Sequence, residues 1–310
     1  MKTINELFDT WNNITPYSEG FLLVSDDHPL SFHIGIHGEK EKIFVVLNTG
    51  KIDNIYSSEA VSAENIQLNN GSYALQFSLK RPSLTELFVK LCWDLMEVSR
   101  NAPNPLSQFI TQYEKWQKLL QRVGDGGLSV VEQKGLIGEL LFIKERATIE
   151  GIEATLTAWV GPEGADQDFD FPNYWAEVKS TTIDGNTFSV SSIQQLNRDT
   201  NGFIVVYFMD RTTSDGPNHI SLTSLVDEIE QLLKSEKQKD IFACKLARIG
   251  YQDTDKDKYK KHKFRLEKHE FFKVTADFPR LTRNNIPSEI VDATYNISLA
   301  AISSFKTSEI

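Results

Sequence analysis

The chain has 310 residues, of which 40% are hydrophobic and 11% aromatic, so it can bury a core in one large or two ordinary domains and is not a disordered protein. Its formal net charge of -10 excludes coating of nucleic acid through bulk positive charge, but it is compatible with an enzyme that has a local basic path. The longest apolar run, residues 202–209, has the length of a strand, and the first residues lack the apolar core of a secretory signal. We therefore expect a cytoplasmic protein with no membrane partner.

The first hundred residues are predicted to be rich in strands. Apolar or alternating runs, separated by turn residues such as those at 48–50, are typical of β-structure. These runs are 21–24, 31–36, 42–47 and 73–79. Apolar residues at helical spacing then predict a helix over 84–98, and the chain is broken around Pro103. We expect a β-rich N-terminal domain in residues 1–100 and a second domain in residues 101–310.

Beyond this break, helices alternate with apolar strands. We predict a helix over 106–123, a flexible joint at the glycine-rich residues 124–127, and a helix over 130–147 that begins with a capping box of Ser129 and Glu132. The elements expected after it are a hairpin at 166–180, a strand at 187–190, a short helix at 191–196, a strand at 202–209, a helix at 222–233 and a strand at 241–248. This order indicates the α/β (α+β) class, with a mixed sheet flanked by helices.

The turn at Pro172-Asn173 determines how the charged residues of the hairpin are arranged. Proline suits the second position of a tight turn and asparagine tolerates the third, so Asp168 directly faces Glu177. The Cβ atoms of such a pair lie roughly 4.5–5.5 Å apart. Alternation along the strands then gives the hairpin a charged face and an apolar face, of which the apolar face can pack on a core. The charged face carries Asp168, Asp170, Glu177 and Lys179, and the apolar face carries Phe169, Phe171, Ala176 and Val178.

Two carboxylates that face each other repel unless a cation neutralises them. A divalent ion removes this repulsion, since Mg²⁺ takes oxygen ligands at about 2.0–2.1 Å and is commonly held by one or two carboxylates and water. Lys179 would lie beside such an ion, where its ammonium group could orient an attacking water or stabilise a transferring phosphate. The turn register favours Asp168, which is directly opposite Glu177, and keeps Asp170 in reserve. The alternative is a metal-free hairpin whose acids are separated or paired with cations.

A further acid, Glu139, lies in the helix expected before the hairpin. Its neighbours three and four residues away are small or apolar, and a charge in such surroundings is costly without a partner. These neighbours are Gly135, Leu136, Phe142 and Ile143. In the alternative, the Glu139 side chain reaches solvent at the edge of an amphipathic helix, and the sequence does not decide between the two.

Together these residues resemble the PD-(D/E)XK nuclease superfamily, which carries such an acid on a helix, an Asp on the next strand and Glu-x-Lys on the partner strand. The resemblance covers roughly residues 129–210 and implies a restriction-endonuclease-like fold. One departure is that Gln167 stands where the superfamily has a proline before its aspartate. The departure leaves three acids at the hairpin to be distinguished. They are Asp166, Asp168 and Asp170.

The resemblance also implies a role for each residue of the site. Asp168, Glu177 and the backbone carbonyl of Val178 would hold Mg²⁺, for which Mn²⁺ can substitute. Glu139 would support this ion or a second one, and Lys179 would position the hydrolytic water. Hydrolysis of a phosphodiester would then proceed by in-line attack of that water.

Two further segments bear on the substrate. Residues 192–196 and 278–281 are similar to a bacterial branch of the superfamily whose members are often encoded beside restriction or phage-defence genes. Gln195 is a candidate contact to a base or a phosphate, unless it belongs to the polar face of its helix. The basic segment 256–273 is either a solvated surface ribbon or a path for nucleic acid. Its candidate nucleic-acid contacts are Lys260, Lys261 and Lys263.

The sequence therefore predicts a Mg²⁺-dependent endodeoxyribonuclease of restriction or phage defence. Its expected partners are DNA, recognised with the help of the β-rich domain, and other defence-system proteins, and a homodimer is left open. The alternative is a non-catalytic subunit that keeps the nuclease fold and binds DNA or a partner protein. The acidic net charge favours this alternative, whereas the presence of all four candidate residues favours the enzyme.

Overall fold

The structure is a computed structural model that describes residues 2–14, 20–38, 41–53, 55–120, 127–198, 201–216 and 218–308. The chain divides into two compact units. The first unit comprises Met1–Gly127 and Ser235–Gln252, and the second comprises Leu128–Lys234 and Asp253–Ile310. No helix in the described part of the chain is long and apolar enough to cross a membrane.

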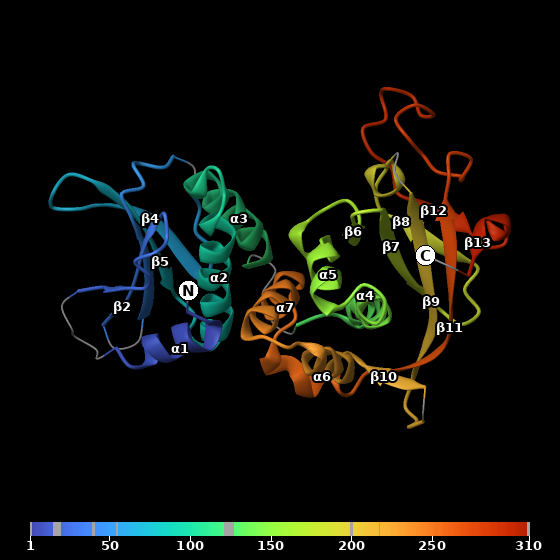
Figure 1. The fold of residues 1–310 in the computed structure, drawn as a ribbon, viewed down its shortest axis with the longest axis horizontal. Coiled ribbons are helices and arrows are strands. Elements are labelled where there is room, and N and C mark those ends of the chain that lie inside the picture. Colours follow the sequence, from blue (N-terminus) through green and yellow to red (C-terminus); the bar gives the residue numbers. More distant parts are fainter. Residues whose placement is uncertain are drawn as a thin grey trace. The chain divides into compact units, whose positions relative to one another are not determined.

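The first unit is built on a five-stranded antiparallel sheet in the order β1-β2-β3-β5-β4 (Figure 1). Its strands are β1 (Leu22–Leu23), β2 (Ser31–His37), β3 (Glu41–Leu47), β4 (Val61–Gln67) and β5 (Tyr73–Leu79). Four of them lie where runs of apolar residues predict strands. Strand β4 escaped prediction because polar residues such as Glu64 and Asn65 interrupt its apolar pattern.

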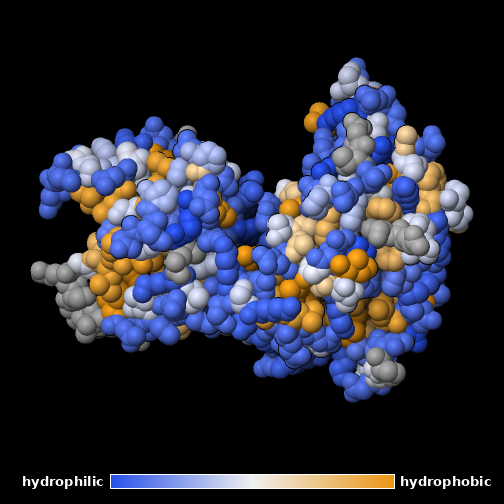
Figure 2. All heavy atoms as spheres, in the orientation of Figure 1, coloured by the Kyte–Doolittle hydropathy of each residue, from blue (hydrophilic) through white to orange (hydrophobic). Residues whose placement is uncertain are grey.

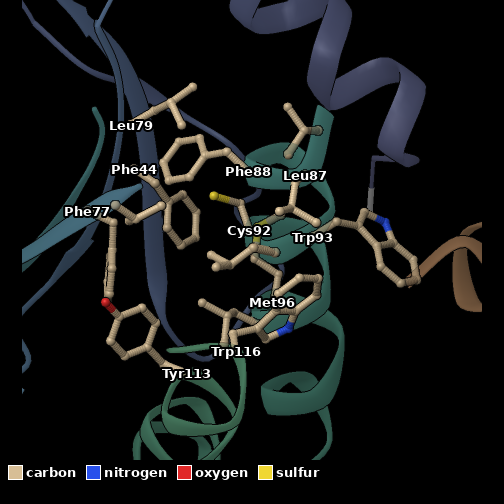
Figure 3. Close-up of a cluster of buried hydrophobic side chains, with 14 of the residues drawn as sticks. Phe44, Phe77, Leu79, Leu87, Phe88, Cys92, Trp93, Met96, Tyr113 and Trp116 are labelled. Atoms are coloured by element: carbon tan, nitrogen blue, oxygen red, sulfur yellow. The ribbon is translucent and has the colours of Figure 1, made fainter. Parts of the chain in front are cut away.

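Helices α2 (Thr85–Arg100) and α3 (Pro105–Leu120) cover one face of this sheet and enclose an aromatic core (Figure 3). Across that core the rings of Phe77 on β5 and Tyr113 on α3 meet edge to face, with their centroids 4.7 Å apart. Helix α3 therefore completes the core of the β-rich unit. For this reason the first unit extends to Gly127, past the boundary expected at the proline-containing break. Residues 121–126, which include most of the expected joint, lie outside the described part.

Helix α7 (Glu236–Ile249) also belongs to the first unit, although it comes late in the chain. The prediction of a strand over 241–248 was wrong. The helix begins with a capping box between Ser235 and Gln238 and ends at Gly250, which is left-handed with φ 102°. These two end signals identify a helix, but the apolar run between them is short enough to resemble a buried strand. The first unit is completed by α1 (Ile4–Asn12), which has its own capping box.

The second unit contains a mixed sheet in the order β10-β11-β9-β7-β6, with β13 also paired to β11. Its strands are β6 (Phe169–Phe171), β7 (Tyr174–Thr181), β9 (Gly202–Thr212), β10 (His219–Ser221), β11 (Lys263–Val274) and β13 (Lys306–Thr307). Strands β7 and β9 are parallel, and the other pairs are antiparallel. The predicted α/β (α+β) fold with a mixed sheet flanked by helices is confirmed.

Helix α4 (Val130–Ala147) has the predicted bounds and the predicted capping box, and it packs on one face of this sheet. Gly138 allows the close approach, because a Cβ atom there would lie 2.5 Å from Ser180 Oγ and 3.2 Å from Val178 Cγ1. The opposite face carries a second apolar cluster that includes Trp175. A two-stranded sheet of β8 (Thr187–Val190) and β12 (Tyr295–Ser298) contributes to that cluster.

The remaining elements are α5 (Ile152–Ala158), α6 (Leu222–Leu232), α8 (Lys256–Tyr259) and the short 3₁₀ helices η1 (Pro82–Leu84), η2 (Gly161–Glu163), η3 (Gln194–Leu196), η4 (Asp253–Asp255) and η5 (Ser303–Phe305).

Candidate active site

The hairpin of β6 and β7 has the register that its turn residues predict. The paired residues are Phe169 with Ala176, Asp170 with Trp175, and Phe171 with Tyr174. The apolar face packs on α4, where the rings of Phe169 and Phe142 meet edge to face with centroids 4.7 Å apart. The charged face is not open to solvent along its length, since Trp175 on that face is fully buried. The site is therefore confined to the edge of β7 after Ala176, where β7 is no longer paired with β6.

Asp168 lies immediately before β6 and is fixed by backbone groups. Its Oδ2 accepts a hydrogen bond from Val178 N at 2.8 Å. Its carbonyl oxygen accepts from Val160 N and Gly161 N, each at 2.9 Å. A Cβ atom at Gly161 would lie 3.2 Å from Asp168 Cα and 3.2 Å from its Oδ1, so this approach favours glycine. The carboxylate is thus held at the edge of β7 by main-chain donors.

Val178 presents more than an N–H group at this edge. The N–H and C=O groups of one residue in an extended strand point to the same side. Since Val178 N points toward Asp168, the Val178 carbonyl faces the same edge. Strand β6 pairs with β7 at residues 174–176 and does not extend to this point.

Asp170, the reserve candidate, is paired with an arginine. It is exposed, and its Oδ1 lies 2.9 Å from Arg198 Nη2. Asp166 is exposed as well. Of the three acids at the hairpin, Asp168 is the one whose side chain the structure bonds to the backbone of β7, at Val178 next to Glu177.

Glu177 and Lys179 form an ion pair at the centre of the site. Glu177 is 1% exposed, and its Oε1 accepts a hydrogen bond from Lys179 Nζ at 2.8 Å. Glu177 Oε2 is buried and accepts no hydrogen bond of ordinary geometry within the described ranges, although the Asp168 backbone N–H acts on the carboxylate. A buried carboxylate oxygen without a donor is costly unless a cation or water satisfies it.

Gln195 holds the other side of the Lys179 ammonium group. Its Oε1 accepts from Lys179 Nζ at 3.3 Å and from Ser191 N at 2.8 Å. Gln167 in turn donates from Nε2 to the carbonyl oxygens of Gln194 at 3.2 Å and Gln195 at 3.1 Å. The residue that replaces the superfamily's proline therefore braces the turn that carries Gln195. Sequence reasoning missed this role because it depends on residues nearly thirty positions apart.

Glu139 turns toward the site and not toward solvent. Its Oε2 accepts a hydrogen bond from the indole Nε1 of Trp159 at 2.7 Å, and Trp159 is fully buried. Glu139 is half-buried on α4. The sequence showed Trp159 close to the hairpin but gave no means of distinguishing core packing from contact with a functional group.

The carboxyl groups of the site have raised pKa values because they are buried close to one another. Burial, with the Asp168 carboxylate, raises the pKa of Glu177 to about 8, against the opposing effects of Lys179 and of the Asp168 backbone N–H. Burial raises the pKa of Asp168, although Lys179 and the Val178 N–H lower it. Burial and the Asp168 carboxylate also raise the pKa of Glu139 well above its usual range. Three carboxyl groups thus share one ammonium group, and the site has an excess of acid.

This set of residues fits a divalent cation chemically, although it does not form a finished cage. Within the part of the chain that the structure describes, no group of three or more His, Cys, Asp or Glu side chains is arranged to hold a metal ion. Each of the three carboxylates has one oxygen engaged by a protein donor: Lys179 for Glu177, Val178 N for Asp168 and Trp159 for Glu139. The buried Glu177 Oε2 and the excess of acid are what an oxygen-binding cation would neutralise.

The three lysines proposed for nucleic-acid contact lie between α8 and the start of β11, and acids neutralise two of them. Lys263 Nζ pairs with Asp215, and Lys260 Nζ lies 3.7 Å from Asp257. Lys261 between them is exposed. The segment therefore has a weaker positive charge than its composition indicates.

Comparison with known proteins gives one match. Residues 8–300 match the model of the family described as "Putative PD-(D/E)XK family member, (DUF4420)". Searches of the curated proteins and of the solved structures found no match. The match confirms the superfamily that the motif resembles, and it points to a nuclease. Because the family model covers nearly the whole length, the chain belongs to this PD-(D/E)XK family.

Proposed function

We propose that the protein is a Mg²⁺-dependent endodeoxyribonuclease that hydrolyses phosphodiester bonds of DNA. The observation that carries this proposal is the cluster of Asp168, Glu177 and Glu139 around one lysine, with Glu177 Oε2 buried and without a hydrogen bond of ordinary geometry in the described structure. Such a cluster is unfavourable for stability alone, because each buried acid raises the cost of ionising the others. The match of residues 8–300 to a PD-(D/E)XK family model supports a catalytic role for this cluster.

Four groups would hold the ion. They are the carboxylates of Asp168 and Glu177, the carbonyl of Val178, and Glu139 as a supporting ligand, with Mg²⁺ in the site or Mn²⁺ as its substitute. When bound, the ion supplies Lewis-acid stabilisation of negative charge at the phosphate.

Lys179 would act on the water or the phosphate. An ammonium group has three donors, and in the described structure two of the Lys179 N–H groups are directed at Glu177 and Gln195. The third is available for an attacking water or for a phosphate oxygen. Because Lys179 is held from two sides, little reorganisation is needed when substrate arrives, which is the condition under which such a group lowers a barrier most.

Glu139 would keep a fixed orientation through Trp159. The indole N–H at 2.7 Å orients the carboxylate and favours its charged form, and Trp159 itself is immobilised by burial. In this arrangement Glu139 reaches the site from α4 while Asp168 and Glu177 come from the hairpin.

Recognition of DNA is part of the same proposal. The β-rich unit would contact DNA or a defence-system protein, and Lys260, Lys261 and Lys263 would contact phosphates. A homodimer is compatible with this proposal. A role in restriction or phage defence is supported by the resemblance of the motifs to a defence-associated branch. Localisation in the cytoplasm is part of that proposed role.

The test is to incubate purified protein with plasmid and linear DNA in Mg²⁺, in Mn²⁺ or in EDTA. We expect cleavage with either metal and none with EDTA. DNA binding without cleavage in any metal would instead favour a non-catalytic binding subunit, for which the acidic net charge of -10 also speaks.

A further inference from the structure

Residues 275–294, here called the arm, join β11 to β12 and contain no helix or strand (Figure 1). In the ribbon the arm is the orange-red segment that projects from its unit beyond β8 and β12. The same projection is mostly hydrophilic in the space-filling view (Figure 2). Segments longer than about 12–15 residues without secondary structure are uncommon inside a compact domain, and function is one of the usual reasons for them.

Several hydrogen bonds join the arm to residues 191–198, here called the turn. Asp292 Oδ1 accepts a hydrogen bond from Ile193 N at 3.0 Å. Thr294 Oγ1 donates to Ser191 O at 3.2 Å. Arg280 Nη1 donates to the carbonyl oxygens of Leu196 and Arg198, the latter at 3.2 Å. The arm therefore contacts both ends and the middle of the turn.

The turn is the part of the chain that holds Lys179. Gln195 Oε1 lies 3.3 Å from Lys179 Nζ, and the same oxygen accepts from Ser191 N at 2.8 Å. A shift of the backbone at Ile193, between Ser191 and Gln195, would move the oxygen that faces the ammonium group. Gln167 braces the turn from the hairpin side, so the arm and the hairpin hold it from two sides.

We propose that Asp292 is a positioning residue for Lys179, acting through the Ile193 backbone and Gln195. The arm in this view sets the place of the ammonium group although it contributes no atom to the site. The inference rests on the proposed function for its catalytic consequence. The mechanical link from Asp292 to Lys179 does not depend on that function.

The decisive experiment compares Asp292→Ala with Asp292→Asn. Asparagine retains an Oδ1 that accepts the bond from Ile193 N, whereas alanine does not. Asp292 is exposed, so neither substitution creates a cavity in the core. Glu289→Ala is the matched control, because Glu289 is an exposed acid of the same arm whose described hydrogen bond is with the adjacent Ser288.

Two readouts are needed. The first is the rate at which Lys179 reacts with acetic anhydride, measured by peptide mass spectrometry. Amide exchange at Ile193 is measured alongside it. The second is kcat and KM for DNA cleavage. We expect Asp292→Ala to raise the reaction rate of Lys179 severalfold and to lower kcat by about 10- to 100-fold with KM unchanged. Asp292→Asn and Glu289→Ala are expected to behave as the wild type.

The proposal is overturned if Asp292→Ala leaves the reactivity of Lys179 unchanged, even when its melting temperature falls, since Asp292 would then be merely structural. It is also overturned if Asp292→Asn behaves like Asp292→Ala, because the charge and not the acceptor oxygen would then matter. If the wild type cleaves no DNA, the proposed function fails, and the reactivity of Lys179 still decides whether Asp292 positions it.

Discussion

Asp168 Oδ2 and the backbone nitrogen of Val178 lie 2.8 Å apart, so the carboxylate takes the place that a residue preceding β6 would occupy if the ladder continued. A side chain thus ends the pairing of two strands and uses an N–H group that would otherwise be open at the edge. The same edge presents the Val178 carbonyl. The start of β6 therefore brings together the Asp168 carboxylate, the Val178 carbonyl and the adjacent Glu177.

The first prediction distinguishes the acids of the hairpin. Asp168→Asn should abolish metal-dependent cleavage, because it removes a charge from the cluster while preserving shape and the bond from Val178 N. Asp170→Asn is the control and should retain activity, since Asp170 is exposed and pairs with Arg198. Cleavage assays and circular dichroism on both variants provide the test. An inactive Asp170 variant beside an active Asp168 variant would contradict the assignment.

The second prediction concerns stability and pH. The pKa of Glu177 is about 8 in the folded chain against a usual value of 4.5, so between these values the folded state binds more protons than the unfolded state. The free energy of unfolding should therefore fall as pH rises through that window. Glu177→Gln should remove this contribution and be more stable than the wild type near pH 8, by about 1–4 kcal/mol. Urea unfolding in EDTA across the window measures it, and parallel curves for the two proteins would contradict it.

The third prediction concerns the metal. Because a cation binds the ionised form of Glu177, binding below pH 8 must displace a proton, and affinity should rise with pH until Glu177 is ionised. Calorimetric titration with Mg²⁺ in two buffers of different ionisation enthalpy should show proton release at about pH 7 and less at about pH 9. A pH-independent affinity would mean that Glu177 is not a ligand.

Much of the hairpin and of helix α4 could be predicted, because their signals are local. The turn residues set the register that places Asp168 beside β7, and the capping box of Ser129 and Glu132 sets the start of α4. Such signals act within a few residues and need no knowledge of the rest of the fold.

The remaining features depend on contacts between distant parts of the chain. Helix α7 belongs to the first unit partly through Arg248, whose Nε donates to the buried Asp94 on α2 at 3.2 Å. The bonds from Trp159 to Glu139 and from Gln167 to the turn are likewise tertiary. A single sequence contains the residues of such contacts but not their pairing, so the supporting residues of the site could not be predicted.

The fourth prediction tests the support of Glu139 by Trp159. Trp159→Phe removes the indole donor and should weaken Mg²⁺ binding by about tenfold. In a Glu139→Gln background the same substitution should have little further effect, because the carboxylate that it orients is gone. A double-mutant cycle on metal affinity gives the coupling. Additive losses would show that Trp159 acts through packing alone.

The fifth prediction concerns the basic segment. Changing Lys260, Lys261 and Lys263 together to Gln should reduce the slope of log affinity for DNA against log salt by about 1, because acids already pair with two of the three. Filter binding over a range of salt concentrations gives the slope. An unchanged slope would remove this segment from the DNA-binding surface.

The most direct test of the account is single-turnover cleavage of DNA in Mg²⁺ by wild type, Asp168→Asn and Lys179→Ala, purified in parallel. We expect Mg²⁺-dependent cleavage by the wild type, its loss in EDTA, and loss of activity in both variants with folding intact. Equal cleavage by all three proteins, or none by the wild type with Mg²⁺ or Mn²⁺, would contradict a nuclease centred on Asp168, Glu177 and Lys179.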